Sequence, residues 1–253
     1  MSANPLRQLF AKGGAAVNGW LAVPSVFSAE IMARAGWDAI TIDMQHGAVD
    51  YGDALAMLTA IAAGGNAVPM VRVPWNEPGA IMRMLDAGAL GVICPMIESA
   101  EAAQAFVRAC RYPPHGARSF GPIRARLIHG DDYAARAAEL VMPFAMIETA
   151  EALARVDEIL DVDGLAGVYI GPADLAYSLG ETPRFDPVAP RVVAAIDRIL
   201  AATRARGLVA GIHNGTPDYA RAMIDKGFQL VTVGSDARFI EAGAKATLAA
   251  MRG

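Results

Sequence analysis

The chain has 253 residues, of which 54% are hydrophobic and 19% are charged, and its formal net charge is -4. This length allows one large hydrophobic core, as in an α/β barrel, or two small domains. The slightly negative charge and the lack of a Lys/Arg-rich run argue against binding to nucleic acid or to an anionic membrane surface, so we expect small-molecule partners.

Apolar strands and alanine-rich amphipathic helices alternate along the chain. The phrases AGWDAITID, AGALGVICP, VDGLAGVYIG and KGFQLVTVG each place a glycine just before an apolar run, which is typical of a helix that ends before a strand. Apolar runs predict strands near residues 20–24, 38–42, 67–73, 91–96, 143–147, 166–171, 208–212 and 229–234. Helical apolar spacing predicts helices at 27–36, 51–64, 78–87, 99–111, 149–160, 188–206, 216–226 and 236–251.

The number of βα units and the chain length are typical of a closed (β/α)8 TIM barrel. A doubly wound open sheet is the alternative. No Ser- or Pro-rich linker divides the chain, so we predict a single domain over residues 1–253. The longest irregular stretch, residues 112–130, is expected to be an active-site loop.

Neither a leader nor a membrane span is evident. The N-terminus has no long apolar segment, and no later apolar run reaches the roughly eighteen residues that a spanning helix requires. Cys94 and Cys110 lack the spacing of a redox or metal motif and are expected to be reduced core thiols. These features predict a cytoplasmic protein.

Polar side chains gather where the predicted strands end. In a barrel of parallel strands all of these ends lie on one rim. Several carboxylates that share a rim with an arginine and a histidine are costly unless a cation joins them, so the pattern predicts a divalent metal. The residues are Asp43 and His46 after the second strand, Arg72 at the third, Glu98 after the fourth, Glu148 at the fifth and Asp174 after the sixth.

Glu148 and Asp174 are the favoured metal ligands. Two carboxylates from neighbouring strand ends leave coordination positions for water and a chelating substrate, and Mg²⁺, Mn²⁺ or Co²⁺ all suit such a site. Taken singly, either acid could instead stabilise the start of a helix. Lys12, Lys226 and Lys245 are the only lysines and none ends a predicted strand, which argues against a Schiff base.

An ordered set of stretches carries a family resemblance: WLAVPSVFSAEIMARAGWDAITIDMQH, VRVPWNEPGAIMRMLDAGALGVICPMIESAEAA, RYPPHGARS, ETAEAL and GVYIGPADLAYSLG. Through them, nearly the whole chain resembles the HpcH/HpaI family of class II pyruvate aldolases. The resemblance implies a metal-dependent lyase that reversibly cleaves 4-hydroxy-2-oxo acids to pyruvate and an aldehyde through a metal-bound pyruvate enolate. It also implies a homohexameric (β/α)8 barrel, and we expect the C-terminal helix to pack on a neighbouring subunit.

The same resemblance implies how the substrate binds. Glu148 and Asp174 would hold the metal, which pyruvate chelates through its carboxylate and keto oxygens, and Arg72 would face the keto oxygen. The backbone amides of Ala173 and Asp174 would receive the pyruvate carboxylate. Trp20, at the end of the first strand, is expected either to line the pocket or to belong to the core.

Three further residues match the family's proton-transfer groups. His46, oriented by Asp43, would be the catalytic base acting through a metal-bound water, and Asp86 would be an acid lent to the neighbouring subunit's site. The chain departs from the family pattern at Gln45, where family members often have Glu, and at Met146, where they often have Gln. These departures change the charge and hydrogen bonding around the site.

Other functions stay open at this point. The Gly-Ser-Asp turn at residues 234–236 is typical of barrels that bind phosphate, as in a phosphosugar isomerase or phospho-aldolase. A malyl-CoA or citryl-CoA lyase uses similar enolate chemistry, and a non-catalytic keto-acid-binding barrel is the alternative from another class. His115, His129 and His213 are expected at the surface or in the pocket for the aldehyde rather than at the metal.

Overall fold

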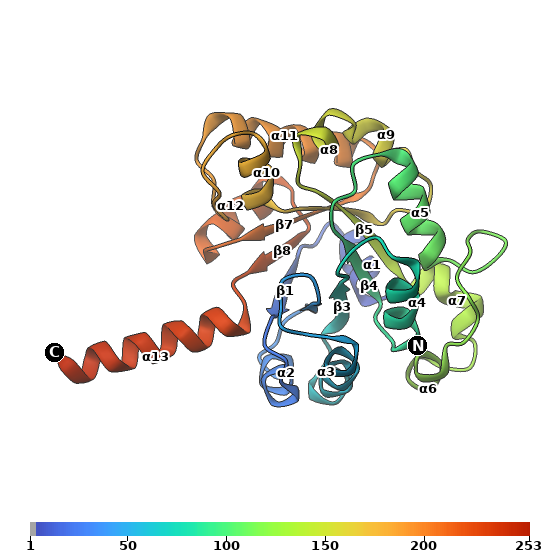
Figure 1. Ribbon diagram of the computed structural model, residues 1–253, viewed down its shortest axis with the longest axis horizontal. Helices are drawn as coiled ribbons and strands as arrows, with labels where there is room; N and C mark the ends of the chain where they lie inside the picture. The colour runs from blue at the N-terminus through green and yellow to red at the C-terminus, as the bar shows by residue number, and fades with distance from the viewer. Residues whose placement is uncertain (1–3) are drawn as a thin grey trace.

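The computed structural model describes residues 4–253, and eight parallel strands in it close into a barrel in chain order (Figure 1). Closure follows from the pairing of the first strand with the last, in which Ala16 is opposite Leu230. The (β/α)8 prediction is therefore confirmed, and the open sheet is wrong. The strands are β1 (Ala16–Leu21), β2 (Ala39–Asp43), β3 (Val68–Arg72), β4 (Gly91–Cys94), β5 (Met142–Ile147), β6 (Gly167–Ile170), β7 (Val209–Asn214) and β8 (Leu230–Val233).

Helices surround the barrel, and several of them begin at a Ser or Thr whose side chain accepts a backbone hydrogen bond. The long helices agree with the predicted ranges to within a few residues. Their bounds are α1 (Pro5–Ala11), α2 (Val26–Ala33), α3 (Tyr51–Gly64), α4 (Pro78–Asp86), α5 (Ala100–Cys110), α6 (Ile123–His129), α7 (Tyr133–Leu140), α8 (Ala150–Ala154), α9 (Val156–Leu160), α10 (Pro172–Ser178), α11 (Pro190–Ala205), α12 (Pro217–Lys226) and α13 (Asp236–Arg252).

The glycines in the four recurring phrases lie in the turns between a helix and the next strand, but only Gly227 itself caps its helix, because the other three helices end at C-caps Arg34, Ala87 and Asp161. Gly36, Gly88, Gly164 and Gly227 have φ angles of +96°, +103°, +100° and +114°, which residues with a Cβ rarely adopt. Each lies a few residues before a strand. These turns set the point at which the chain enters the barrel.

Buried side chains form two layers of core. One cluster fills the space between the strands and the outer helices, and both cysteines belong to it as free thiols. The other fills the barrel itself, and there Phe144 and Leu230 share a cluster with Leu6 and Phe10 of α1. Helix α1, which the sequence pattern did not predict, therefore helps to close the N-terminal end of the barrel.

The segment 112–130 lies at the end of the barrel opposite the predicted rim. It follows α5 and precedes β5, and a helix in a βα unit returns to the N-terminal end of the strands. Its C-terminal part forms α6, and the part before α6 is irregular. The expectation of an active-site loop at this position is therefore wrong for the chain's own barrel.

Helix α13 projects away from the barrel (Figure 1). Its first residue, Asp236, is buried and accepts hydrogen bonds from the amide of Ala22 at 2.8 Å and the hydroxyl of Ser28 at 2.9 Å. Every later residue of the helix is exposed. Within residues 4–253, no helix has the length and apolarity needed to cross a membrane.

Candidate active site

A pocket of about 290 Å³ opens at the C-terminal end of the strands, and it gathers most of the residues expected there. Glu148 lies behind its wall, because a Cβ added to the pocket residue Gly171 would come within 2.6 Å of Glu148 Oε2. The expected residues that line the pocket directly are Trp20, Asp43, His46, Arg72, Ala173 and Asp174.

Asp43 and Arg72 form a buried bidentate ion pair in this pocket. Arg72 Nε donates to Asp43 Oδ1 at 2.9 Å and Nη2 donates to Oδ2 at 2.6 Å. Burial alone would raise the pKa of Asp43, but the hydrogen bonds and charge of Arg72 outweigh it and hold that pKa below its usual range. The indole N–H of Trp20 donates to the same carboxylate at 3.2 Å, so the guanidinium is fixed in orientation.

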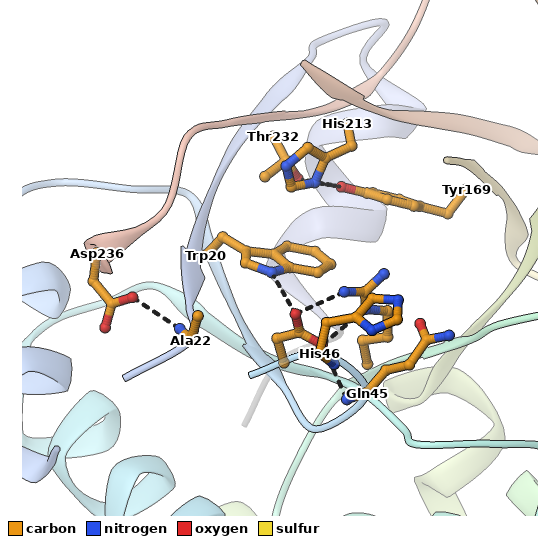
Figure 2. Close-up of polar contacts among 10 residues, drawn as sticks. Trp20, Ala22, Gln45, His46, Tyr169, His213, Thr232 and Asp236 are labelled. Carbon is orange, nitrogen blue, oxygen red and sulfur yellow. Dashed lines mark hydrogen bonds and ion pairs between the residues drawn. The ribbon is translucent and has the colours of Figure 1, made fainter. Parts of the chain in front are cut away.

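Asp43 also shapes the loop that carries His46. Its Oδ1 accepts hydrogen bonds from the backbone amides of Gln45 at 3.0 Å and His46 at 3.2 Å (Figure 2). The structure therefore shows Asp43 acting on the backbone of His46 and not on its imidazole, as an Asx turn does. The oxygen of the Gln45 side chain is buried and has no partner among the described residues.

Glu148 is a buried acid with a distinct environment. Its side-chain Oε1 accepts a hydrogen bond at 2.9 Å from the amide of Met96, a residue that has a left-handed φ of +55°. Burial raises the pKa of Glu148 to about 7, the Met96 amide opposes this shift and the negative charge of Asp174 adds to it. Within residues 4–253 no group donates a hydrogen bond to Oε2, so this oxygen is available to a cation.

Asp174 follows β6 as the third residue of α10. The amides of Ala173 and Asp174 belong to the first helical turn, where N–H groups have no intrahelical partner, and both residues line the pocket. The oxygen donors of Glu148 and Asp174 fit a hard divalent cation. In the described part of the chain, no group of three or more His, Cys, Asp or Glu side chains is arranged so that it could hold a metal ion.

The wall formed by β6, β7, the loop between α10 and α11 and the start of α13 contains residues that the sequence pattern did not single out, such as Tyr169, Phe185 and Arg238. His213 lies there too, in the pocket rather than at the surface. Burial lowers the pKa of His213 to about 3, with a further contribution from the charge of Arg72, so its imidazole is neutral and a poor base.

The remaining expected residues lie elsewhere. Asp86 ends α4 and forms an ion pair at 2.7 Å with Arg118, whose side chain is fully buried, and neither residue lines the pocket of its own chain. His115 lines a groove beside α5 and α9. His129 is buried at the end of α6, where Nε2 lies 3.0 Å from the carbonyl of Gly88.

Comparison with known proteins gives one consistent result. The family model described as HpcH/HpaI aldolase/citrate lyase matches residues 19–242. The hydroxypyruvate/pyruvate aldolase of Rhizorhabdus wittichii is 45% identical over 249 residues, which cover 98% of this chain and 99% of that protein. The 4-hydroxy-2-oxo-heptane-1,7-dioate aldolase of Klebsiella pneumoniae is 37% identical over 97% of this chain and 93% of its own length.

A solved structure of an HpcH/HpaI aldolase/citrate lyase family protein from Burkholderia cenocepacia has the same fold. Its TM-score with this chain is 0.91, at 34% identity and with 98% of both chains covered. The family match extends over most of the barrel and includes every pocket residue named above. The chain therefore belongs to the HpcH/HpaI aldolase/citrate lyase family.

Proposed function

We propose that this protein is a divalent-metal-dependent aldolase that reversibly cleaves 4-hydroxy-2-oxo acids to pyruvate and an aldehyde. Both curated relatives are named as aldolases. The observation that carries the proposal is one pocket in which the Arg72 guanidinium and the Asp174 carboxylate meet, with the Glu148 carboxylate directly behind the wall. Mg²⁺, Mn²⁺ and Co²⁺ are the proposed metals.

Each residue has a role in this reaction. Glu148 and Asp174 would hold the cation, which when bound supplies positive charge to the keto oxygen of the substrate. The guanidinium of Arg72 donates hydrogen bonds to that oxygen, and the amides of Ala173 and Asp174 receive the substrate carboxylate. Because Asp43 fixes the guanidinium in advance, little reorganisation is needed when negative charge develops.

His46 moves the proton. In the cleavage direction it accepts the proton of the 4-hydroxyl group, the bond between C3 and C4 breaks, and the aldehyde leaves. The electron pair of that bond forms the enolate of pyruvate, and protonated His46 then gives its proton to C3, which returns the imidazole to its neutral form. In the synthetic direction His46 takes a methyl proton from pyruvate, and the resulting enolate carbon attacks the aldehyde.

The proposal also covers the oligomeric state of the protein and its location in the cell. We propose a homohexamer in which Asp86 serves the neighbouring subunit's site, since this acid lies outside its own pocket. The exposed helix α13 supports contact with another subunit. The cytoplasmic location stays a prediction from the sequence.

Chelation tests the metal requirement. We expect EDTA to abolish pyruvate release from a 4-hydroxy-2-oxo acid, and each of Mg²⁺, Mn²⁺ and Co²⁺ to restore it after the chelator is removed. Glu148→Gln should not respond to any of the ions. Full activity of the wild-type protein in EDTA would overturn the roles of Glu148 and Asp174.

Hydrogen exchange separates an enzyme from a non-catalytic keto-acid-binding barrel. An aldolase of this kind should incorporate solvent deuterium into the methyl group of pyruvate without any aldehyde, whereas a sensor should incorporate none. The lyase alternative for CoA esters has less support, because the two relatives described above, which match nearly the whole chain, are named as aldolases.

A further inference from the structure

One wall of the pocket has no role in the proposed reaction apart from the hydrogen bond that Trp20 donates to Asp43. The keto acid uses the side formed by Arg72 and Asp174, which leaves the wall of Trp20, Phe185 and His213 for the aldehyde. In this wall the ring of His213 packs edge-on against Trp20 at a centroid distance of 5.0 Å and lies tilted against Phe185 at 5.1 Å. The imidazole of His213 thus lies against two aromatic rings of this wall.

Hydrogen bonds inside the barrel connect His213 to the neighbouring strands. His213 Nδ1 lies 3.2 Å from the hydroxyl of Tyr169, and that hydroxyl lies 2.6 Å from Thr232 Oγ1 (Figure 2). Thr232 in turn contacts the amide of Asn18 at 2.8 Å. These residues come from β7, β6, β8 and β1, so the chain of contacts crosses the barrel interior.

The amide of Asn18 sets the direction of every hydrogen bond in this chain. With its nitrogen toward the carbonyl oxygens of Gly19 and Ala39, both at 3.2 Å, its oxygen accepts from Thr232 at 2.8 Å and from Thr41 at 2.9 Å. The opposite orientation would bring the amide oxygen against these two carbonyl oxygens, which have no proton to donate. The Thr232 hydroxyl therefore donates to Asn18.

The proton positions on Tyr169 and His213 follow from this direction. Because the Thr232 hydroxyl donates its proton to Asn18, Thr232 Oγ1 accepts a hydrogen bond from the Tyr169 hydroxyl. A hydroxyl has one proton, so the Tyr169 oxygen accepts from His213 Nδ1–H. In a neutral imidazole the other nitrogen, Nε2, is then an acceptor, and within residues 4–253 it has no hydrogen-bond partner.

We propose that His213 determines specificity for the aldehyde: its Nε2 accepts a hydrogen bond from a hydroxyl group next to the aldehyde carbonyl. The protein then favours hydroxyaldehydes over alkyl aldehydes of the same length. An alkyl aldehyde would cover the nitrogen without offering a donor, and the aromatic rings on either side limit replacement by water. This inference rests on the proposed aldolase function and adds the substrate class to it.

The test compares glycolaldehyde with acetaldehyde as acceptors for pyruvate. We expect the wild-type protein to prefer glycolaldehyde in kcat/KM by about tenfold or more, and His213→Phe, which keeps a ring without an acceptor, to lose that preference. The loss should appear mainly as a higher KM for glycolaldehyde. His213→Gln, which restores an acceptor, should recover part of the preference, and an outer-surface substitution, His115→Gln, should change nothing.

Tyr169→Phe tests the positioning of the ring. Without the Tyr169 oxygen, Nδ1–H loses its acceptor, so ¹⁵N NMR of labelled histidine should show His213 shifting from one tautomer to a mixture, together with a smaller glycolaldehyde preference. A wild-type preference that survives in His213→Phe would overturn the inference. Deuterium exchange into pyruvate distinguishes failure of this inference from failure of the proposed aldolase function. If the wild type exchanges deuterium but shows no preference for glycolaldehyde, only the role of His213 is overturned. If the wild type exchanges none, the aldolase function is overturned as well.

Discussion

At the scale of single residues, the candidate site contains a buried ion pair between Asp43 and Arg72, to which we have assigned a structural and a proposed chemical role. The carboxylate of Asp43 is nearly all enclosed, and the Arg72 guanidinium is its charge partner. A buried carboxylate without its partner is strongly destabilising, so removal of Arg72 is expected to lower stability in addition to its proposed effect on catalysis. Substitutions at this pair need a design that separates the two effects.

The ion pair leads to a prediction with two readouts. Arg72→Ala should lower kcat by about 100-fold, because a hydrogen-bond donor to the developing oxyanion is lost. It should also lower the free energy of unfolding by about 3 kcal/mol, because Asp43 stays buried and charged. In the double variant with Asp43→Asn, denaturant unfolding should show recovered stability while pyruvate release stays low. Recovered activity would assign the enolate stabilisation to another group.

Glu148 leads to a prediction about pH. Its pKa in the folded protein, about 7, is above the usual Glu value, so the folded state binds the proton more tightly than the unfolded state does. Without metal, the stability that this proton contributes is complete at low pH and is lost as the pH rises through about 7. Glu148→Gln should therefore be the more stable protein at pH 8 in EDTA, by up to about 3 kcal/mol.

Urea unfolding of both proteins at pH 5 and pH 8 checks this prediction. Added Mn²⁺ should stabilise wild type at pH 8 and leave Glu148→Gln unchanged, because ligand binding to the folded state alone raises its stability. The same pH dependence of stability in both proteins would contradict the environment assigned to Glu148.

At the scale of elements, α1 acts as a closing segment for the barrel. Leu6 and Phe10 are buried in the barrel cluster, and the side-chain nitrogen of Asn4 donates to the carbonyl of Leu140 at 2.6 Å. The helix has only seven residues and is too short to be stable alone, so it forms because this packing exists. It is distant from the pocket and affects activity through stability alone.

We therefore expect Leu6→Ala to lower the free energy of unfolding by about 2–4 kcal/mol, because it leaves a cavity under the barrel. Leu127→Ala, at a position 83% exposed in α6, is the matched control and should change stability by less than about 0.5 kcal/mol. Denaturant titration measures both. Equal effects of the two substitutions would show that α1 does not close the barrel.

At the scale of the whole molecule, the part of α13 beyond its first turn presents an apolar surface without a partner among residues 4–253. Ile240, Leu248 and Met251 are 60%, 50% and 81% exposed, and their spacing places them along one side of the helix. A helix that leaves such a stripe in water is typical of an oligomer contact. The C-terminal helix thus supports the proposed assembly through the surface that it leaves uncovered.

The assembly prediction is tested on that stripe. The double variant Ile240→Glu/Leu248→Glu should shift the protein to smaller species in sedimentation velocity, since charge is introduced into an apolar contact. Lys245→Ala, on the same helix, should leave the assembly unchanged. If the double variant sediments like the wild type, α13 does not hold subunits together.

Complementation tests the shared site. If Asp86 serves a neighbouring subunit, Asp86→Asn and Arg72→Lys should each have low activity, and mixed oligomers of the two should regain up to about a quarter of the wild-type rate. The gain arises because some sites then combine an intact Asp86 with an intact Arg72. Mixtures that stay at the level of the separate variants would confine Asp86 to its own chain.

The amino-acid sequence by itself determined the barrel and the edge on which the polar residues gather. Runs of apolar residues preceded by glycine indicate strands locally. In a barrel of parallel strands, the C-terminal ends of all strands lie on the same rim, so a side chain at such an end lies on that rim. The sequence therefore predicts that Asp43, Arg72 and Asp174 lie together, and all three line the pocket. Short helices such as α1 and α10 have too few turns to produce a clear period, so the sequence pattern does not predict them.

Tertiary structure decided which partner each group has. The family resemblance implies that Asp43 orients His46, yet its carboxylate binds the guanidinium of Arg72 and reaches His46 through the backbone. The proton on His213 depends on Tyr169 and on residues from two further strands. Hydrophobic periodicity is a local property of the chain. Hydrogen-bond partners and burial arise only when distant strands close into a barrel. The proposed chemistry of this pocket depends on those partners and on that burial.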